Sequence, residues 1–134
     1  MNTTPTATRI LAAGFIAAIA VPIAFAVPAN AKGSDAKIRE GNCSGSTDWK
    51  VKAKPDDGRI EFEGEIDSNR NGQTWNWVIN HNGSRSASGS ATTKAPSGSF
   101  SVERRLVNLS GVDTFVFRAT NPKSGEVCRG TVSL

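Results

Sequence analysis

His81 is the only histidine of the 134-residue chain, and it precedes a serine-rich stretch at residues 84–93. A serine hydrolase needs a base beside its nucleophile, and histidine commonly supplies that base. A serine close to a histidine is expected by chance in a chain this rich in serine, and sequence order alone does not identify a catalytic triad. We therefore expect no catalytic residue and no enzymatic activity, with the His81 side chain exposed at a hairpin tip.

Residues 67–72, with the sequence Asp-Ser-Asn-Arg-Asn-Gly, match the first half of a calcium-binding loop. The twelfth position of such a loop needs a bidentate glutamate, and Val78 stands there instead. Arg70 adds a positive charge inside the loop, so we favour a polar turn between two strands. Two cysteines and one histidine do not complete a zinc site. We expect neither a metal nor a cofactor.

Trp75 and Trp77 stand two residues apart, and they are either a stacking platform for a ligand or part of a core strand. In an extended strand they share one face with Ile79, while Asn76 and Asn80 share the other. If the rings faced solvent, the two amides would be buried at a cost. Burying the indoles is favourable where their N–H groups find acceptors. We therefore assign the tryptophans to the core.

Residues 48–67 show apolar side chains at every second position on both sides of a turn. Alternation of this kind around Pro, Asp and Gly residues indicates a β-hairpin. A four-residue loop at residues 55–58 places lysines opposite glutamates on the solvent face, and such pairs stabilise a sheet. In that register the expected cross-strand neighbours are Lys54–Arg59, Lys52–Glu61, Lys50–Glu63, Ala53–Ile60, Val51–Phe62 and Trp49–Gly64.

The rest of the chain continues the pattern of short strands and turns. Asn82-Gly83 predicts a two-residue type I′ turn, and the serine-rich strand after it is expected to be a short or irregular edge strand. Arg104 shares the inward face of residues 99–107, which requires either a bulge or a place at the sheet border. Turn signals about every 8–12 residues and no helix after residue 31 predict a seven-stranded immunoglobulin-like β-sandwich over residues 43–134.

This pattern resembles that of small exported bacterial sandwich proteins of the immunoglobulin-like or fibronectin-III-like kind, which have no assigned activity. The chain contains no tyrosine, so the tyrosine corner of that fold is absent, and the resemblance implies no site residues. A second resemblance, to bacterial cellulose-binding sandwiches, rests on an end-to-end cysteine pair, polar turns and three tryptophans. Those modules expose an aromatic strip, whereas the frame of alternation here buries all three rings.

The first 31 residues have the features of a secretory signal peptide. Arg9 precedes the uncharged, mostly apolar residues 10–21, and Pro28-Ala29-Asn30-Ala31 supplies the small residues of a cleavage site. A membrane anchor is the alternative, but prolines interrupt the roughly 20 apolar residues that a spanning helix needs. We predict cleavage after Ala31, a polar lead at residues 32–42, no membrane span in the mature chain, and an extracellular or cell-envelope location.

The two cysteines, Cys43 and Cys128, stand near opposite ends of the predicted domain. Because an exported protein meets an oxidising compartment, an even pair predicts a disulfide. This bridge would join the first and last strands, unlike the inter-sheet bridge of antibody domains.

Composition and the predicted strand faces narrow the choice of function. The net charge of +4 is small and scattered, and it does not indicate nucleic-acid binding. Strands three, six and seven are expected to share one sheet, whose outer face is either an ordinary half-polar surface or a binding face. We expect a monomeric, secreted, non-enzymatic module that binds a protein or a cell-envelope glycan, with a carbohydrate-binding module as the alternative. The candidate binding residues are Asn76, Val78, Asn80, Val116, Arg118 and Arg129.

The leader generates the first testable prediction. The chain should accumulate outside the cytoplasm and begin at Lys32, because the small residues before that position fit the signal peptidase. Intact-mass measurement of the exported product checks this. Recovery of residues 1–31 in a membrane fraction would replace the signal peptide with an anchor.

Overall fold

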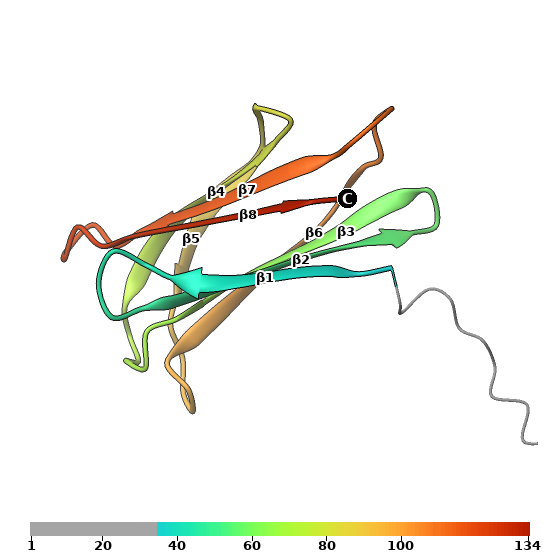
Figure 1. Cartoon of the computed structure of the whole chain (residues 1–134). Coiled ribbons are helices and arrows are strands. Elements are labelled where there is room, and N and C mark those ends of the chain that lie inside the picture. Colours follow the sequence, from blue (N-terminus) through green and yellow to red (C-terminus); the bar gives the residue numbers. More distant parts are fainter. Residues whose placement is uncertain (1–34) are drawn as a thin grey trace, which may run out of the picture.

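The computed structural model describes residues 35–134, which form two four-stranded antiparallel sheets facing each other as a β-sandwich (Figure 1). Sheet A has the order β1 (Lys37–Asn42), β2 (Asp48–Asp56), β3 (Arg59–Asp67) and β6 (Ser99–Val107). Sheet B has the order β5 (Ser84–Thr92), β4 (Thr74–His81), β7 (Thr114–Thr120) and β8 (Val127–Ser133). The all-β class is therefore confirmed, with eight strands instead of seven. The predicted signal peptide at residues 1–31 lies outside the described residues.

The additional strand, β1, occupies most of the segment predicted as a polar lead at residues 32–42. It pairs with β2 from Lys37 opposite Ala53 to Asn42 opposite Asp48. All of its side chains but one are exposed, so the sequence shows no apolar alternation there. Arg39 lies opposite the buried Val51 and so occupies an inward position on this edge strand. Inward charges discourage further strand pairing at an edge.

β2 and β3 form the predicted hairpin, but its turn contains two residues and the predicted register is wrong. Asp57 and Gly58 both have positive φ, 47° and 76°, as a type I′ turn requires. Every pair is shifted by two residues, which keeps each side chain on its predicted face. The observed neighbours are Lys54–Glu61, Lys52–Glu63, Lys50–Glu65, Ala53–Phe62, Val51–Gly64 and Trp49–Ile66. Opposite charges therefore still meet on the outer face.

The core between the sheets contains the inward side chains of both. Trp75 and Trp77 are 0% and 4% exposed, so their assignment to the core is confirmed. Phe117 packs its ring against Gly64 of the facing sheet, where a Cβ atom would lie 2.8 Å from the ring. A side chain at Gly64 would thus push the two sheets apart. The other buried apolar residues are Val51, Ala53, Ile60, Phe62, Ile66, Ile79, Phe100, Val102, Phe115, Ala119, Cys128 and Val132.

Tryptophan rings close the two open sides of the sandwich. On one side the Trp49 ring packs against β1 and β8, where Cβ atoms at Gly41 and Gly130 would lie 2.6 and 2.5 Å from it. On the other side the Trp77 ring packs against Gly89, and the Arg104 guanidinium lies 5.0 Å from the ring centroid. Close backbone approach at these glycines is what leaves room for the rings.

Two further predictions concern the edge strands β5 and β6. β6 pairs with β3 in an unbroken register, so Arg104 is explained by its place on the border strand and not by a bulge. β5 is an edge strand as predicted and its register shifts between Ile79 and Asn80 of β4. With nine residues it is irregular but not short.

The disulfide joins Cys43, which directly follows β1, to Cys128 in β8, with a Cα–Cα distance of 4.3 Å. The pairing of the two cysteines is confirmed, but the predicted first strand corresponds to β2, and the bridge follows the additional strand β1. Because β1 belongs to sheet A and β8 to sheet B, the bridge also crosses between the sheets, contrary to the expected contrast with antibody domains. Hydrogen bonds flank it: Ser44 N donates to Val127 O at 2.9 Å, and Thr47 Oγ1 to Glu126 Oε1 at 2.7 Å.

Replacing Cys43 and Cys128 together with alanine should lower the free energy of unfolding by about 4–5 kcal/mol, because the bridge closes a long loop. Denaturant midpoints of the oxidised, reduced and double-alanine proteins measure the effect. Thiol titration of the denatured, unreduced protein should give no free thiol. Equal midpoints for the oxidised and reduced proteins would contradict the assignment of stability to the bridge.

Candidate functional site

The six candidate binding residues lie together on the outer face of sheet B, the surface turned away from sheet A. β4, β7 and β8 are neighbours, as expected. Each candidate alternates along its strand with buried residues, which fixes its outward direction. The pairing forms cross-strand rows: Val78–Arg118–Arg129, Asn80–Val116–Thr131 and Asn76–Thr120–Val127.

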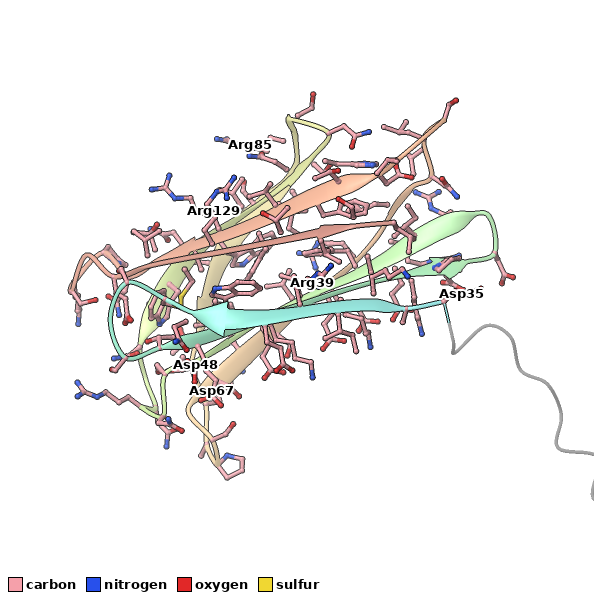
Figure 2. The ribbon with its side chains drawn as sticks, in the orientation of Figure 1. Asp35, Arg39, Asp48, Asp67, Arg85 and Arg129 are labelled. Atoms are coloured by element: carbon pink, nitrogen blue, oxygen red, sulfur yellow. A yellow bond between two sulfur atoms is a disulfide. The ribbon has the colours of Figure 1, made fainter. Side chains whose placement is uncertain are left out.

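Arg85 of β5 belongs to the same face and was missed from the sequence. It pairs with Asn80, so it extends the middle of the face by one strand. Figure 2 shows Arg85 and Arg129 projecting from sheet B on the side away from sheet A. The signal was present in the turn: Asn82 and Gly83, with φ of 48° and 85°, place Ser84 opposite His81 and Arg85 opposite Asn80. The prediction of a short strand after Gly83 leaves Arg85 out of the candidate binding residues.

The outer face of sheet B carries positive charge without any negative charge. β4, β5, β7 and β8 contain no aspartate or glutamate. Arg85, Arg118 and Arg129 are exposed, and none of their guanidinium groups makes a hydrogen bond or ion pair with another residue of the range 35–134. On sheet A, by contrast, three cations have carboxylate partners: Lys52–Glu63 at 3.5 Å, Lys54–Glu61 at 3.4 Å and Arg105–Asp56 at 3.0 Å.

Arg118 and Arg129 stand directly opposite each other on β7 and β8. Directly opposed side chains have Cβ atoms about 4.5–5.5 Å apart, and like charges in such a pair destabilise the sheet. A carboxylate at either position would stabilise the same backbone. Two like-charge pairs on sheet A, Asp48–Asp67 and Glu63–Glu103, each include a carboxylate with a partner of its own, whereas neither arginine has a side-chain partner among residues 35–134.

Polar side chains at the two ends of the face bond to one another, and those in its middle do not. At one end Thr74 Oγ1 lies 3.1 Å from Thr92 Oγ1, and Ser90 Oγ donates to Asn76 Oδ1 at 2.8 Å. At the other end Thr114 Oγ1 lies 2.9 Å from Ser133 Oγ. Within the described chain, the side chains of Asn80, Ser88 and Thr131 have no such partner. The central donors and acceptors are thus available to a ligand.

His81 is buried, so its predicted exposure at a hairpin tip is wrong. It continues the inward alternation of β4 and is 7% exposed. Its Nε2 lies 2.6 Å from Asp113 Oδ1, and its ring stacks on Phe115 with a centroid distance of 4.4 Å. Asp113 also exchanges two backbone hydrogen bonds with Leu134, at 3.0 and 2.9 Å. The histidine therefore links β4 to the β6–β7 loop and to the end of the chain, and its Nε2 atom is already paired with Asp113.

The loop at residues 67–72 is a turn held by its own hydrogen bonds. Asn69 N donates to Asp67 Oδ1 at 3.1 Å, and the buried Ser68 donates Oγ–H to Gly98 O at 3.2 Å. Asn69 and Gly72 adopt positive φ, 55° and 79°. Across residues 35–134, no three His, Cys, Asp or Glu side chains gather to hold a metal ion.

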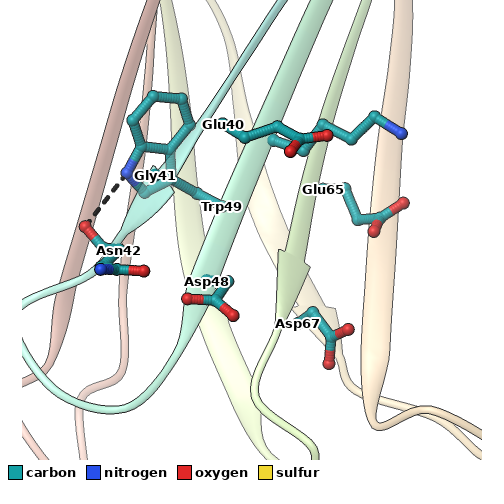
Figure 3. Close-up of a pocket in the computed structure, with 8 residues that line it drawn as sticks. Glu40, Gly41, Asn42, Asp48, Trp49, Glu65 and Asp67 are labelled. Carbon is teal, nitrogen blue, oxygen red and sulfur yellow. Dashed lines mark hydrogen bonds between the residues drawn. The ribbon is translucent and has the colours of Figure 1, made fainter.

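A hollow on sheet A collects acidic side chains (Figure 3). Asp48 and Asp67 are direct cross-strand neighbours, and Lys50 stands between Glu40 and Glu65 in the register. At its border, Trp49 Nε1 donates to Asn42 O at 3.2 Å. These carboxylates lie on the opposite sheet from the three arginines, so the two outer faces differ in the sign of their charge. The other residues lining the hollow are Gly41 and Asn42.

Replacing Arg129 with glutamate should raise the free energy of unfolding by about 0.2–1 kcal/mol, because it turns the repulsive pair with Arg118 into an opposite-charge pair. Denaturant midpoints measure the change. Arg85→Glu is the matched control. The residue opposite Arg85 is the uncharged Asn80, so the free energy of unfolding of this variant should stay within about 0.5 kcal/mol of the parent. A less stable R129E beside an unchanged R85E would show that Arg118 and Arg129 do not repel each other.

Within the described part of the chain, no helix is long and apolar enough to cross a membrane. A scan against protein-family models and searches of curated proteins and of solved structures found no match to this chain. The geometry of the sandwich and the chemistry of its faces are therefore the basis for the function.

Proposed function

We propose that the chain is an exported, non-enzymatic β-sandwich module that acts by binding, and that the outer face of sheet B is its binding surface. The observation that carries the proposal is the set of three unpaired arginines, Arg85, Arg118 and Arg129, on a face without any carboxylate. One pair of them opposes like charges, which costs stability. Such an arrangement fits a surface selected for a partner outside the chain, either a protein or a cell-envelope component.

The extracellular or cell-envelope location is part of the proposal. The signal-peptide features of residues 1–31 support it. The Cys43–Cys128 disulfide supports it independently, because disulfides persist in oxidising compartments and are rare in reducing ones.

The immunoglobulin-like or fibronectin-III-like character of the sandwich is proposed from its strand order. Counted from β2, the sheets read first-second-fifth and fourth-third-sixth-seventh. The immunoglobulin constant-type order is first-second-fifth-fourth and third-sixth-seventh. The two differ in the sheet that holds the fourth strand, and β1 is an addition at the edge. Members of this wider group share the sandwich without always sharing its topology.

The runner-up, a cellulose-binding type of module, needs an exposed aromatic strip. Trp75 and Trp77 are buried, and the Trp49 ring is packed between Gly41 and Gly130. Stacking of a flat sugar polymer on Trp75 and Trp77 would require the sandwich to open, and the half-buried Trp49 is a single ring instead of a strip. Recognition on the outer face of sheet B relies on hydrogen bonds and charge instead.

The test compares the residues 32–134 protein with two triple variants of equal net charge. One replaces Arg85, Arg118 and Arg129 with serine; the control replaces the exposed Arg59, Lys94 and Lys123 with serine. Each is immobilised and exposed to cell-envelope fractions. The parent and the control should retain the same component, and the face variant should lose it because the unpaired cations are gone. Equal retention by both variants, or retention by none, would overturn the proposal.

A further inference from the structure

We infer that the ligand of this face is an acidic glycan, a polysaccharide whose carboxylate, sulfate or phosphate groups bind the arginines. This inference rests on the proposed function, since it takes the outer face of sheet B as the binding surface. It adds the chemical class of the ligand and the residues that select it.

The opposed pair Arg118 and Arg129 is the anion site of the face. A guanidinium presents a planar fork of donors that matches carboxylate, sulfate or phosphate oxygens. The Cβ atoms of the two residues stand about 5 Å apart across β7 and β8, and neither guanidinium has a partner in residues 35–134. An anion held between them replaces one repulsion with two attractions. The destabilising pair thereby becomes favourable in the complex.

The position of Arg85 favours a polymer over a small anion. Arg85 is two strands from Arg118 and three from Arg129, and one row away from both. Neighbouring strands lie about 4.8 Å apart and successive rows about 6.7 Å apart, so the Cα distances are about 12 and 16 Å. One small anion does not reach across this span. A chain with repeated charges does.

The surface between the arginines suits sugar hydroxyl groups. Asn80 and Ser88 lie in the rows that connect Arg85 to Arg118, and Thr131 borders Arg129. None of the three has a side-chain partner among the described residues, so each offers a donor and an acceptor. The half-buried Val78 and Val116 add a small apolar contact for a sugar ring. The face is thus polar, flat and positively charged.

Other polyanions and protein partners fit this face less well. The centres of protein interfaces are enriched in aromatic anchors as well as in arginine, whereas this centre holds arginines and valines but no aromatic ring. Single-stranded nucleic acid needs stacking platforms, but the aromatic rings of sheet B point into the core. The acidic hollow around Asp48 and Asp67 repels a polyanion from the opposite sheet, which confines binding to one side.

The experiment titrates the residues 32–134 protein with polygalacturonate, dextran sulfate, polyphosphate, neutral dextran and poly-deoxythymidine. At least one of the two acidic glycans should bind, and neutral dextran should not. Raising salt from 50 to 200 mM should weaken binding about 20–40-fold if three arginines act as they do on phosphates. Polyphosphate is a polyanion without sugar, so it shows whether anionic groups alone are sufficient for binding. It should bind more weakly than the preferred acidic glycan.

Single variants separate the role of the arginine pair from folding. Arg129→Glu should weaken glycan binding at least about tenfold, since it introduces a repulsive charge at the site, while the variant stays folded. Arg129→Lys keeps the charge but loses the fork, so its Kd should fall between those of the parent and R129E. Arg59→Glu, on sheet A, changes the net charge equally and should leave Kd within about threefold because of screening.

Three outcomes would overturn the inference. The first is that neutral dextran binds as tightly as the preferred acidic glycan, and the second is that poly-deoxythymidine or polyphosphate binds more tightly than both acidic glycans. The third is an unchanged Kd of the R129E variant for the preferred acidic glycan. If no glycan binds but envelope retention still depends on Arg85, Arg118 and Arg129, the proposed function stands and the ligand class is wrong. If that retention is also independent of the arginines, both proposals are wrong.

Discussion

Closure of the two open sides of the sandwich is the constraint on which the other features depend. Two facing sheets bury only their inner faces, so water reaches the core from both sides unless something fills each gap. On the β1/β8 side Trp49 packs on Gly41 and Gly130, and the Cys43–Cys128 bridge holds the same strands. On the β5/β6 side Trp77 fills the gap under Arg104. The aromatic rings of residues 35–134 lie between the sheets or at these closed sides, so the outer faces of the described chain carry no ring.

The two outer faces differ in how their charged side chains are paired. On sheet A, lysines and glutamates oppose one another along β2 and β3, so the face contributes to hairpin stability. On sheet B, hydroxyl and amide groups bond to one another at the ends of the face, while the central cations face solvent unpaired. A like-charge pair survives there at a cost in stability, as expected for a surface whose partner is absent from the chain itself.

The sequence predicts faces well and register or edge strands poorly, and the reasons are physical. Alternation predicts the buried tryptophans and six residues of the face, because burial acts on every second residue of a strand, whereas the disulfide follows from export and the even number of cysteines. β1 is not predicted from the sequence, because an edge strand that is exposed on both faces needs no alternation of apolar and polar residues. The sequence predicts Pro55 in the turn, but it is the penultimate residue of β2, beyond the part that pairs with β1, so its missing N–H breaks no ladder. His81 continues the inward alternation of Trp75, Trp77 and Ile79, but its place at the hairpin tip favours exposure, and its buried partner, Asp113, is 32 residues away.

The rigidity of the sheet lowers the entropic cost of binding at the proposed face. Its cations stand on paired strands, so binding orders arginine side chains but no loop, which limits the entropic cost of association. In the proposed complex only three charges would contribute, each of them open to solvent, so one domain would hold one segment of an acidic polymer weakly and in a salt-dependent way. A polymer with many equivalent segments offers many such sites, and rebinding along it raises the apparent affinity without any new contact. A flat, polar face with a few unpaired arginines is therefore suited to retention on a charged matrix more than to tight capture of a single molecule.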